Sequence, residues 1–446
     1  MQLSVFKRRA IYLILLHTEI NHSEILSMAQ VDQGKVWTFR DAGQLPLPLR
    51  ILNAIGGVFP ASSQLQLETL VSRATDATGL TDFGGEEWRE GLHCLVEAIN
   101  TGELLTTFGA MSERGMFQSL LEQRLQLIDY AKRHPEVKEE KIEAPIIVLG
   151  LPRTGTTLLS YLLDLDPQSR SLLSWESMQV VPPPSLAGQQ TDDRIARLCR
   201  QEAQLSKLIP PMPAMHPQGA TQPTECIPLL MMDFRSQGFE TQFLSTRYGK
   251  WLDQCDMTSA YKLHKLALQT LQSTIPTKRW ALKTPQHLWS LNALLESYPD
   301  ARLIWTHRDP CKVLPSVASL NMAFYRTFSR DPNPEEVAEH WLSKLLLGVE
   351  RGMAFDEQSA TPNWCTHLHY SELMRDPIAA VRGIYQQMGE ELDPLHVKRM
   401  RIWMQTRPKN TYGTHRYDLA DFGLEAAQVN ERFSVYINRF GVSVEQ

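Results

Sequence analysis

The sequence predicts an α/β fold, in which helices flank a parallel β-sheet and a helical N-terminal region precedes it. Beyond residue 141, short apolar runs rich in β-branched residues alternate with helical patterns, which is typical of parallel sheets. Before it, segments with apolar residues three and four positions apart predominate. A highly charged connector places the predicted boundary between residues 1–140 and 141–446.

The N-terminal region is expected to contain at least three helices. Their apolar residues recur with a helical period in residues 65–80, 85–100 and 115–134. The beginning of the chain leaves alternatives open, because three cations precede a short apolar run, as in a signal peptide. We favour a buried helix, or a later start at Met28.

The parallel sheet is expected from four apolar runs, which are residues 145–150, 279–282, 301–307 and 364–369. Two proline-rich stretches, residues 180–185 and 208–226, interrupt this pattern. Proline cannot donate a backbone hydrogen bond, so we predict loops there, and long loops between regular elements often cover a site. We expect both to act as lids.

The composition of the 446-residue chain is that of a globular protein, with 43% hydrophobic and 21% charged residues and a net charge of −5. This mild acidity argues against nucleic-acid binding. The six cysteines never form a C-x-x-C pair, which favours a reducing, cytoplasmic location. No apolar run approaches the roughly 20 residues of a membrane span, so no stable membrane insertion is expected.

The segment "GLPRTGTTLL" joins the first predicted strand to a helix and has the glycine spacing of a phosphate-binding loop. Gly150 and Gly155 let the chain turn and let an anion approach the backbone, while the helix N-terminus adds positive charge. Arg153 supplies a cation, and Thr156 and Thr157 supply hydroxyl donors. We therefore predict an anion site and a sheet of the P-loop type.

Thr156 stands where a nucleotide-triphosphate loop has its lysine, so nothing in the motif reaches the β- and γ-phosphates. The strand of residues 301–307 ends in His307, followed by Arg308, rather than in an aspartate for magnesium, although Asp309 comes next. The pattern favours a cofactor with a single phosphate-type group at its 5′ end. Side chains would neutralise it, and no metal is expected.

Two segments resemble the sulfotransferases that use 3′-phosphoadenosine 5′-phosphosulfate (PAPS). "PRTGTTLLSYLLDLDP" is similar to their 5′-phosphosulfate loop, and "WTHRDPCKVLPSVASL" to their 3′-phosphate segment. The resemblance covers residues 141–440 and is to a broad, mostly bacterial branch, with motifs like those of tyrosylprotein sulfotransferases. It implies PAPS as co-substrate, in-line transfer of a sulfuryl group to a hydroxyl or amine, and no metal.

By this resemblance, three segments bind the co-substrate. The first loop contributes Arg153, Thr154, Gly155, Thr156, Thr157 and Leu158. The second segment contributes Arg308 and Ser316, which clamp the 3′-phosphate. A loop near the C-terminus departs from the family's usual motif, but its position implies roles for Lys409, Gly413 and His415.

The resemblance also implies the catalytic groups. Arg153 and Lys283 are expected to stabilise charge on the leaving phosphate. The base that takes the acceptor's proton is either Glu176, as in the tyrosylprotein type, or His287, near the histidine of the cytosolic phenol and steroid enzymes. His287 lies two residues beyond the family's position, so we rank Glu176 first.

Four further residues were considered for the site. His216 and Glu225, in the second proline-rich stretch, are candidate acceptor contacts. His367 and His369 alternate without a nearby third ligand, so we predict a strand there rather than a metal site.

Two rival functions stay open, a P-loop kinase or NTPase that binds ATP with magnesium, and a non-catalytic nucleotide-binding scaffold. The expected acceptor is a small-molecule, lipid or glycan hydroxyl. The sequence indicates neither which of these it is nor the oligomeric state.

Overall fold

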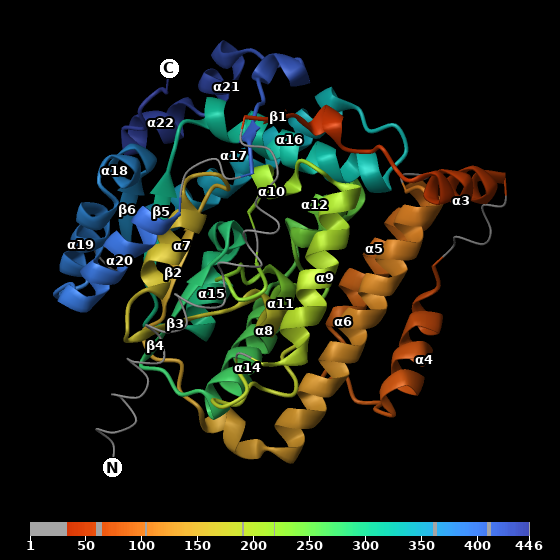
Figure 1. Cartoon of the computed structure of the whole chain (residues 1–446), viewed down its shortest axis with the longest axis horizontal. Coiled ribbons are helices and arrows are strands. Elements are labelled where there is room, and N and C mark those ends of the chain that lie inside the picture. Colours follow the sequence, from red (N-terminus) through yellow and green to blue (C-terminus); the bar gives the residue numbers. More distant parts are fainter. Residues whose placement is uncertain are drawn as a thin grey trace.

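A five-stranded parallel sheet lies at the centre of the computed structural model (Figure 1), in the order β3-β4-β2-β5-β6. The structure describes residues 34–58, 65–102, 105–189, 191–217, 219–359, 364–407 and 412–445. The strands are β2 (Ile146–Gly150), β3 (Ser169–Ser171), β4 (Arg279–Lys283), β5 (Arg302–His307) and β6 (Cys365–His369). The predicted α/β class and its parallel sheet are confirmed. All four predicted strands are present; polar β3 was not predicted.

Alternate residues of the strands face two different hydrophobic cores. Ile146 and Val148 of β2 pack in a core with four helices, which are α7 (Thr156–Asp164), α18 (Tyr370–Arg375), α19 (Pro377–Gln387) and α20 (Pro394–Thr406). Ile147 and Leu149 belong to a larger core on the other face. Its main helices are α14 (Thr258–Thr274), α16 (Pro310–Phe328) and α17 (Pro334–Gln358).

The described part of residues 141–446 contains further helices. They are α8 (Ser174–Met178), α9 (Asp193–Leu208), α10 (Met212–Met215), α11 (Ile227–Met231), α12 (Gly238–Gln242), α13 (Thr246–Leu252), α15 (Leu291–Ser297), α21 (Ala426–Arg432) and α22 (Ser434–Phe440). No helix of the described residues is both long and apolar enough to cross a membrane.

The helical N-terminal region packs into the same large core as the sheet. Its helices are α3 (Leu47–Val58), α4 (Leu67–Thr78), α5 (Trp88–Gly102) and α6 (Thr107–Arg133), and Figure 1 shows α4, α5 and α6 far from α19 and α20. The predicted helices are confirmed, but α6 begins at Thr107 instead of near residue 115. The hydroxyl of Thr106 accepts a hydrogen bond from the Gly109 N–H at 3.0 Å and so caps its N-terminus.

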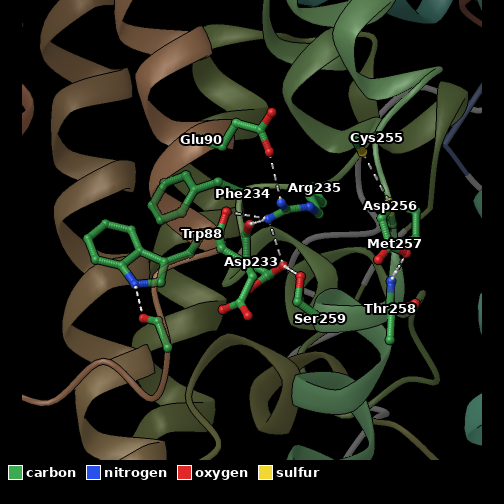
Figure 2. Close-up of polar contacts among 12 residues, drawn as sticks. Trp88, Glu90, Asp233, Phe234, Arg235, Cys255, Asp256, Met257, Thr258 and Ser259 are labelled. Carbon is green, nitrogen blue, oxygen red and sulfur yellow. Dashed lines mark hydrogen bonds and ion pairs between the residues drawn. The ribbon is translucent and has the colours of Figure 1, made fainter.

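A buried ion-pair network around Asp233 joins the N-terminal helices to the rest of the chain. The Asp233 carboxylate accepts hydrogen bonds from Arg124 of α6 at 2.7 Å, from Arg235 at 3.1 Å and from the Ser259 hydroxyl at 2.6 Å. Arg235 also pairs with Glu90 of α5 (Figure 2). The division at residue 140 stays a prediction, but the two parts share a core and this network.

The second proline-rich stretch is more regular than predicted. It contains the one-turn helix α10, and Pro223 forms an isolated antiparallel bridge with Leu173. The prediction of loops alone was therefore wrong for residues 208–226, because the bridge uses the Gln222 carbonyl and the Thr224 N–H on either side of Pro223 and needs no N–H from the proline itself. Residues 180–185 form a loop, as predicted. The role of the two stretches as lids stays a prediction.

A two-stranded parallel sheet ties together segments from the two ends of the sequence. Strand β1 (Val36–Trp37) pairs with β7 (Thr414–His415). The Thr414 N–H donates to the Lys35 carbonyl at 2.9 Å, and the Arg416 N–H donates to the Trp37 carbonyl at 2.8 Å. The predictions for the start of the chain, before Gly34, lie outside the described residues.

Candidate active site

The β2–α7 turn has the geometry of an anion-binding loop. It follows the central strand β2, at the edge where the strand order changes direction and ligands of α/β sheets bind. Gly150 and Gly155 have φ of +131° and +89°, conformations that glycine adopts most readily. The loop therefore turns where the glycine spacing predicted, directly before the N-terminus of α7.

Replacing Gly150 with alanine is expected to destabilise the fold by about 2–4 kcal/mol, because strain and overpacking add. A Cβ atom there would lie 2.6 Å from the Thr306 carbonyl oxygen, which belongs to the backbone of β5 and cannot move aside. Thermal unfolding of the variant measures this loss. Gly115→Ala on α6 is the control, since no atom lies within 4 Å of its added Cβ. A melting temperature of the Gly150→Ala variant equal to that of the wild-type protein would contradict this close approach.

Arg153, Arg308 and Ser316 come together at the carboxyl ends of β2 and β5. The Arg153 Nε donates to the Ser316 hydroxyl at 3.0 Å, and an Arg308 Nη donates to the Arg153 carbonyl at 2.9 Å. Arg153 has φ of +66°, an uncommon conformation for a residue with a side chain. Burial and the neighbouring Arg308 lower the pKa of Arg153, as expected for two cations close together.

The ring of Tyr370 was not anticipated in this cluster. It lies 3.9 Å from the Arg308 guanidinium, and a Cβ atom on Gly155 would meet it at 3.1 Å. Tyr370 begins α18 directly after β6. Residues that follow parallel strands gather at one edge of the sheet, and this is the signal that could have found it.

The remaining loop residues have distinct surroundings. The Thr154 hydroxyl donates to the Leu151 carbonyl at 2.6 Å and lies 2.6 Å from the Thr306 hydroxyl, so it braces the loop from within. Thr156 is buried and Thr157 half-buried in the first turn of α7. Leu158 packs against the smaller core.

Lys283 and Glu225 form an ion pair beside this cluster. The Lys283 Nζ lies 2.8 Å from one Glu225 carboxylate oxygen, and the Thr284 hydroxyl donates to the other at 3.2 Å. Burial would raise the pKa of Glu225, but Lys283, His216 and these hydrogen bonds hold it below its ordinary value. The backbone fixes the pair too, since the Cys226 N–H donates to the Lys283 carbonyl at 3.0 Å.

His216 completes this side of the site. Burial, together with the nearby Arg153 and Lys283, lowers its pKa to about 4. The imidazole is therefore neutral at pH 7 and has one donor and one acceptor nitrogen. His216 and Glu225, considered above only as acceptor contacts, thus lie in the electrostatic field of the two predicted catalytic cations.

Glu176 lies in a different environment from the one expected of a base. It is fully buried, and one carboxylate oxygen accepts from Arg170 at 2.8 Å while the other accepts from the Leu173 N–H at 3.3 Å. Arg170 in turn donates to the Leu271 and Ile275 carbonyls. These contacts tie Glu176 to the helix start and to α14, and its role as the base stays a prediction.

His287 is likewise part of the core. Its Nδ1 lies 2.8 Å from the Tyr261 hydroxyl, and its ring packs edge-on against His264. Burial and His264 lower its pKa well below the ordinary value. The role of His287 as a base stays a prediction.

The loop near the C-terminus reaches the cluster through His415. The His415 Nε2 lies 2.8 Å from the Ser319 hydroxyl, one turn beyond Ser316 on α16. Burial and Arg153 lower the pKa of His415 to about 4. Gly413 packs against β1, where a Cβ atom would lie 2.7 Å from the Lys35 carbonyl oxygen. Lys409 lies outside the described residues.

His367 and His369 lie on β6, in the predicted strand. The His307 Nε2 lies 2.8 Å from the His367 Nδ1, and the Tyr436 hydroxyl lies 3.1 Å from the other His307 nitrogen. Within the described ranges, no group of three or more His, Cys, Asp or Glu side chains could hold a metal ion.

This fold and site define a class, that of α/β transferases with an anion loop at the carboxyl edge of a parallel sheet. The chain belongs to the sulfotransferase family, whose model matches residues 145–394. It is thus an enzyme that transfers a sulfuryl group from a sulfate donor, and the predicted family and enzyme class are confirmed.

Mycobacterial proteins are similar to this chain. The omega-hydroxy-beta-dihydromenaquinone-9 sulfotransferase Stf3 of Mycobacterium bovis is 24% identical over 304 residues, which are 67% of this chain and 75% of that protein. The crystal structure of sulfotransferase STF9 from Mycobacterium avium has 34% identity and a TM-score of 0.78, covering 85% of this chain and 97% of that one. Sulfotransferase STF1 from Mycobacterium tuberculosis H37Rv has 29% identity and a TM-score of 0.75, covering 84% and 99%.

Proposed function

We propose that the donor is PAPS and that Arg153, Arg308 and Ser316 bind its phosphate groups. The observation that carries this proposal is the convergence of two arginines and a serine at the end of β2 and β5. Two close guanidinium groups repel each other, so the cluster favours a ligand with several negative charges. The left-handed Gly155 and the α7 N-terminus favour one such anion at the loop.

Lys283 and Glu225 would divide the chemistry between them. PAPS supplies the sulfuryl group: its S–O bond to the 5′-phosphate breaks as the acceptor oxygen forms a new S–O bond. Lys283 and Arg153 stabilise the charge that develops on the departing phosphate. Glu225 takes the acceptor's proton, which keeps the charge balanced. As Lys283 turns toward the phosphate, Glu225 loses its counter-ion and its proton affinity rises.

The proposed acceptor is a small apolar molecule or lipid that carries a hydroxyl group. The name of the M. bovis relative describes a hydroxylated menaquinone acceptor, which is of this kind.

We also place the enzyme in the cytoplasm. No disulfide bond joins any of the six cysteines, all of which lie in the described residues, and this fits a reducing compartment.

Calorimetric titration with 3′,5′-adenosine bisphosphate, 5′-AMP and ATP with magnesium tests the donor. We expect the bisphosphate to bind more tightly than 5′-AMP, because Arg308 and Ser316 contact the 3′-phosphate. Preference for ATP with magnesium would contradict PAPS as the donor.

Arg308→Ala is expected to weaken the bisphosphate about 100-fold, the effect of removing one partner of a charged contact, and to leave 5′-AMP within about threefold. The same titrations measure both affinities. Arg382→Ala is the control, because Arg382 is exposed on α19. Equal losses for the two nucleotides would contradict the role of Arg308.

A further inference from the structure

The guanidinium group of Arg308 is held by a carboxylate of the chain itself. Its Nε and one Nη donate to the two carboxylate oxygens of Glu445 at 2.7 and 2.9 Å. This is the forked, bidentate geometry in which arginine binds carboxylates and phosphates. The second Nη donates to the Arg153 carbonyl, so these three contacts engage all three guanidinium nitrogens.

The backbone holds Glu445 in the same place. Its N–H donates at 2.8 Å to one carboxylate oxygen of Asp309, whose other oxygen accepts from the Cys311 N–H at the start of α16. The pair is not sealed from water, because the Glu445 side chain retains 30% of its exposure and the Arg308 side chain 14%. A soluble anion can therefore reach the pair and compete for Arg308.

The charges of the Glu445 carboxylate and of a 3′-phosphate determine which of the two binds Arg308. In the enzyme without nucleotide, Glu445 neutralises one of two neighbouring arginines. A 3′-phosphate would bring up to two negative charges to the same fork, and it cannot share that fork with a carboxylate a few ångströms away without strong repulsion. The two arrangements therefore exclude each other.

We propose that Glu445 is a tethered competitor of the 3′-phosphate: it holds Arg308 in the nucleotide-free enzyme and is displaced when the nucleotide binds. This inference rests on the proposed role of Arg308 in binding PAPS. Between turnovers, the contact with Glu445 keeps the guanidinium group of Arg308 in the orientation that binds the 3′-phosphate. It also assists release of the bisphosphate product, because a carboxylate is ready to replace the departing phosphate.

The first test compares Glu445→Gln with wild-type enzyme by calorimetry. Glutamine keeps the shape of the side chain and removes its charge. The bisphosphate is expected to bind about tenfold more tightly, because Arg308 no longer has to be released from a carboxylate before it can bind the 3′-phosphate. The affinity for 5′-AMP should stay within twofold. Glu431→Gln on α21 is the matched control, because Glu431 is exposed and lies on a neighbouring helix. It should change neither affinity.

Hydrogen exchange of residues 441–445 gives a second readout. Saturating bisphosphate should accelerate exchange at the Glu445 N–H in the wild-type enzyme, because the contact with Asp309 opens as the side chain leaves. Saturating 5′-AMP should not do so.

The outcomes separate this inference from the function on which it rests. If wild-type enzyme prefers the bisphosphate but Glu445→Gln binds it equally or less tightly, the competitor role is overturned and the PAPS assignment stands. Unchanged exchange on bisphosphate binding also overturns the competitor role. If wild-type enzyme shows no preference for the 3′-phosphate, both proposals fail.

Discussion

Replacing Glu225 with glutamine is expected to lower kcat by about 10²–10⁴-fold, the usual contribution of a general base. Glutamine can keep a hydrogen bond to Lys283 but cannot accept the acceptor's proton. Affinity for 3′,5′-adenosine bisphosphate should not fall, because the substitution removes a negative charge near Arg153 and Lys283. Single-turnover transfer from PAPS, beside calorimetric titration, measures the two effects separately.

Glu176→Gln and His287→Ala are the informative controls for this prediction. Their contacts with Arg170 and Tyr261 predict lower stability, with transfer by the folded fraction retained. Loss of transfer in folded Glu176→Gln enzyme, with Glu225→Gln still active, would return the base to the position that the sequence favoured. If both variants at 176 and 225 remain active, His216 is the next candidate, because its neutral imidazole lies near the same cations.

Replacing Asp233 with asparagine is expected to destabilise the fold by about 3–5 kcal/mol, as is usual when one member of a buried ion pair is removed. The side chains of Asp233, Arg124 and Arg235 retain no more than 5% of their exposure, so both arginines would remain in the interior without this carboxylate, and Arg235 would keep only the exposed Glu90. Chemical denaturation measures the loss. Asp76→Asn, at an exposed position of α4, should stay within about 0.5 kcal/mol of wild type.

The Asp233 prediction also concerns how the molecule is organised. Because the network joins α5 and α6 to the chain around α11, its loss should loosen the N-terminal helices together with the sheet domain, in a single transition. Two separate transitions in the variant would show that residues 34–140 can unfold independently. A melting temperature equal to that of Asp76→Asn would contradict the structural role of the network.

The sheet could be predicted from the sequence because a strand buried on both faces needs a continuous apolar run, as in residues 146–150. The loop could be predicted because its two glycines take conformations that other residues adopt with strain. Strands β1 and β7 could not be predicted, because a strand of two residues is too short to show an alternating pattern. Polar β3 at the sheet edge has no apolar run either.

The surroundings of the candidate bases could not be predicted from the sequence, for a physical reason. Glu176 was chosen by its flanking residues, yet a carboxylate's chemistry depends on its spatial neighbours, and Arg170 lies only six residues away in the chain. Glu225 and Lys283 are 58 residues apart and meet only because the extended segment before α11 runs beside β4. No local pattern encodes such a meeting.

The pairing of β1 with β7 has a consequence for how the enzyme is made. The Trp37 side chain donates to the Tyr412 carbonyl across 375 residues of chain. Translation supplies the first of these segments early and the second near the end, so β1 must wait through most of synthesis for its partner. The pairing of β1 with β7, which positions His415 near the arginine cluster, can therefore form only after nearly all of the polypeptide has left the ribosome. A ribosome-bound chain ending before residue 412 would lack this strand pair and the contact between His415 and Ser319.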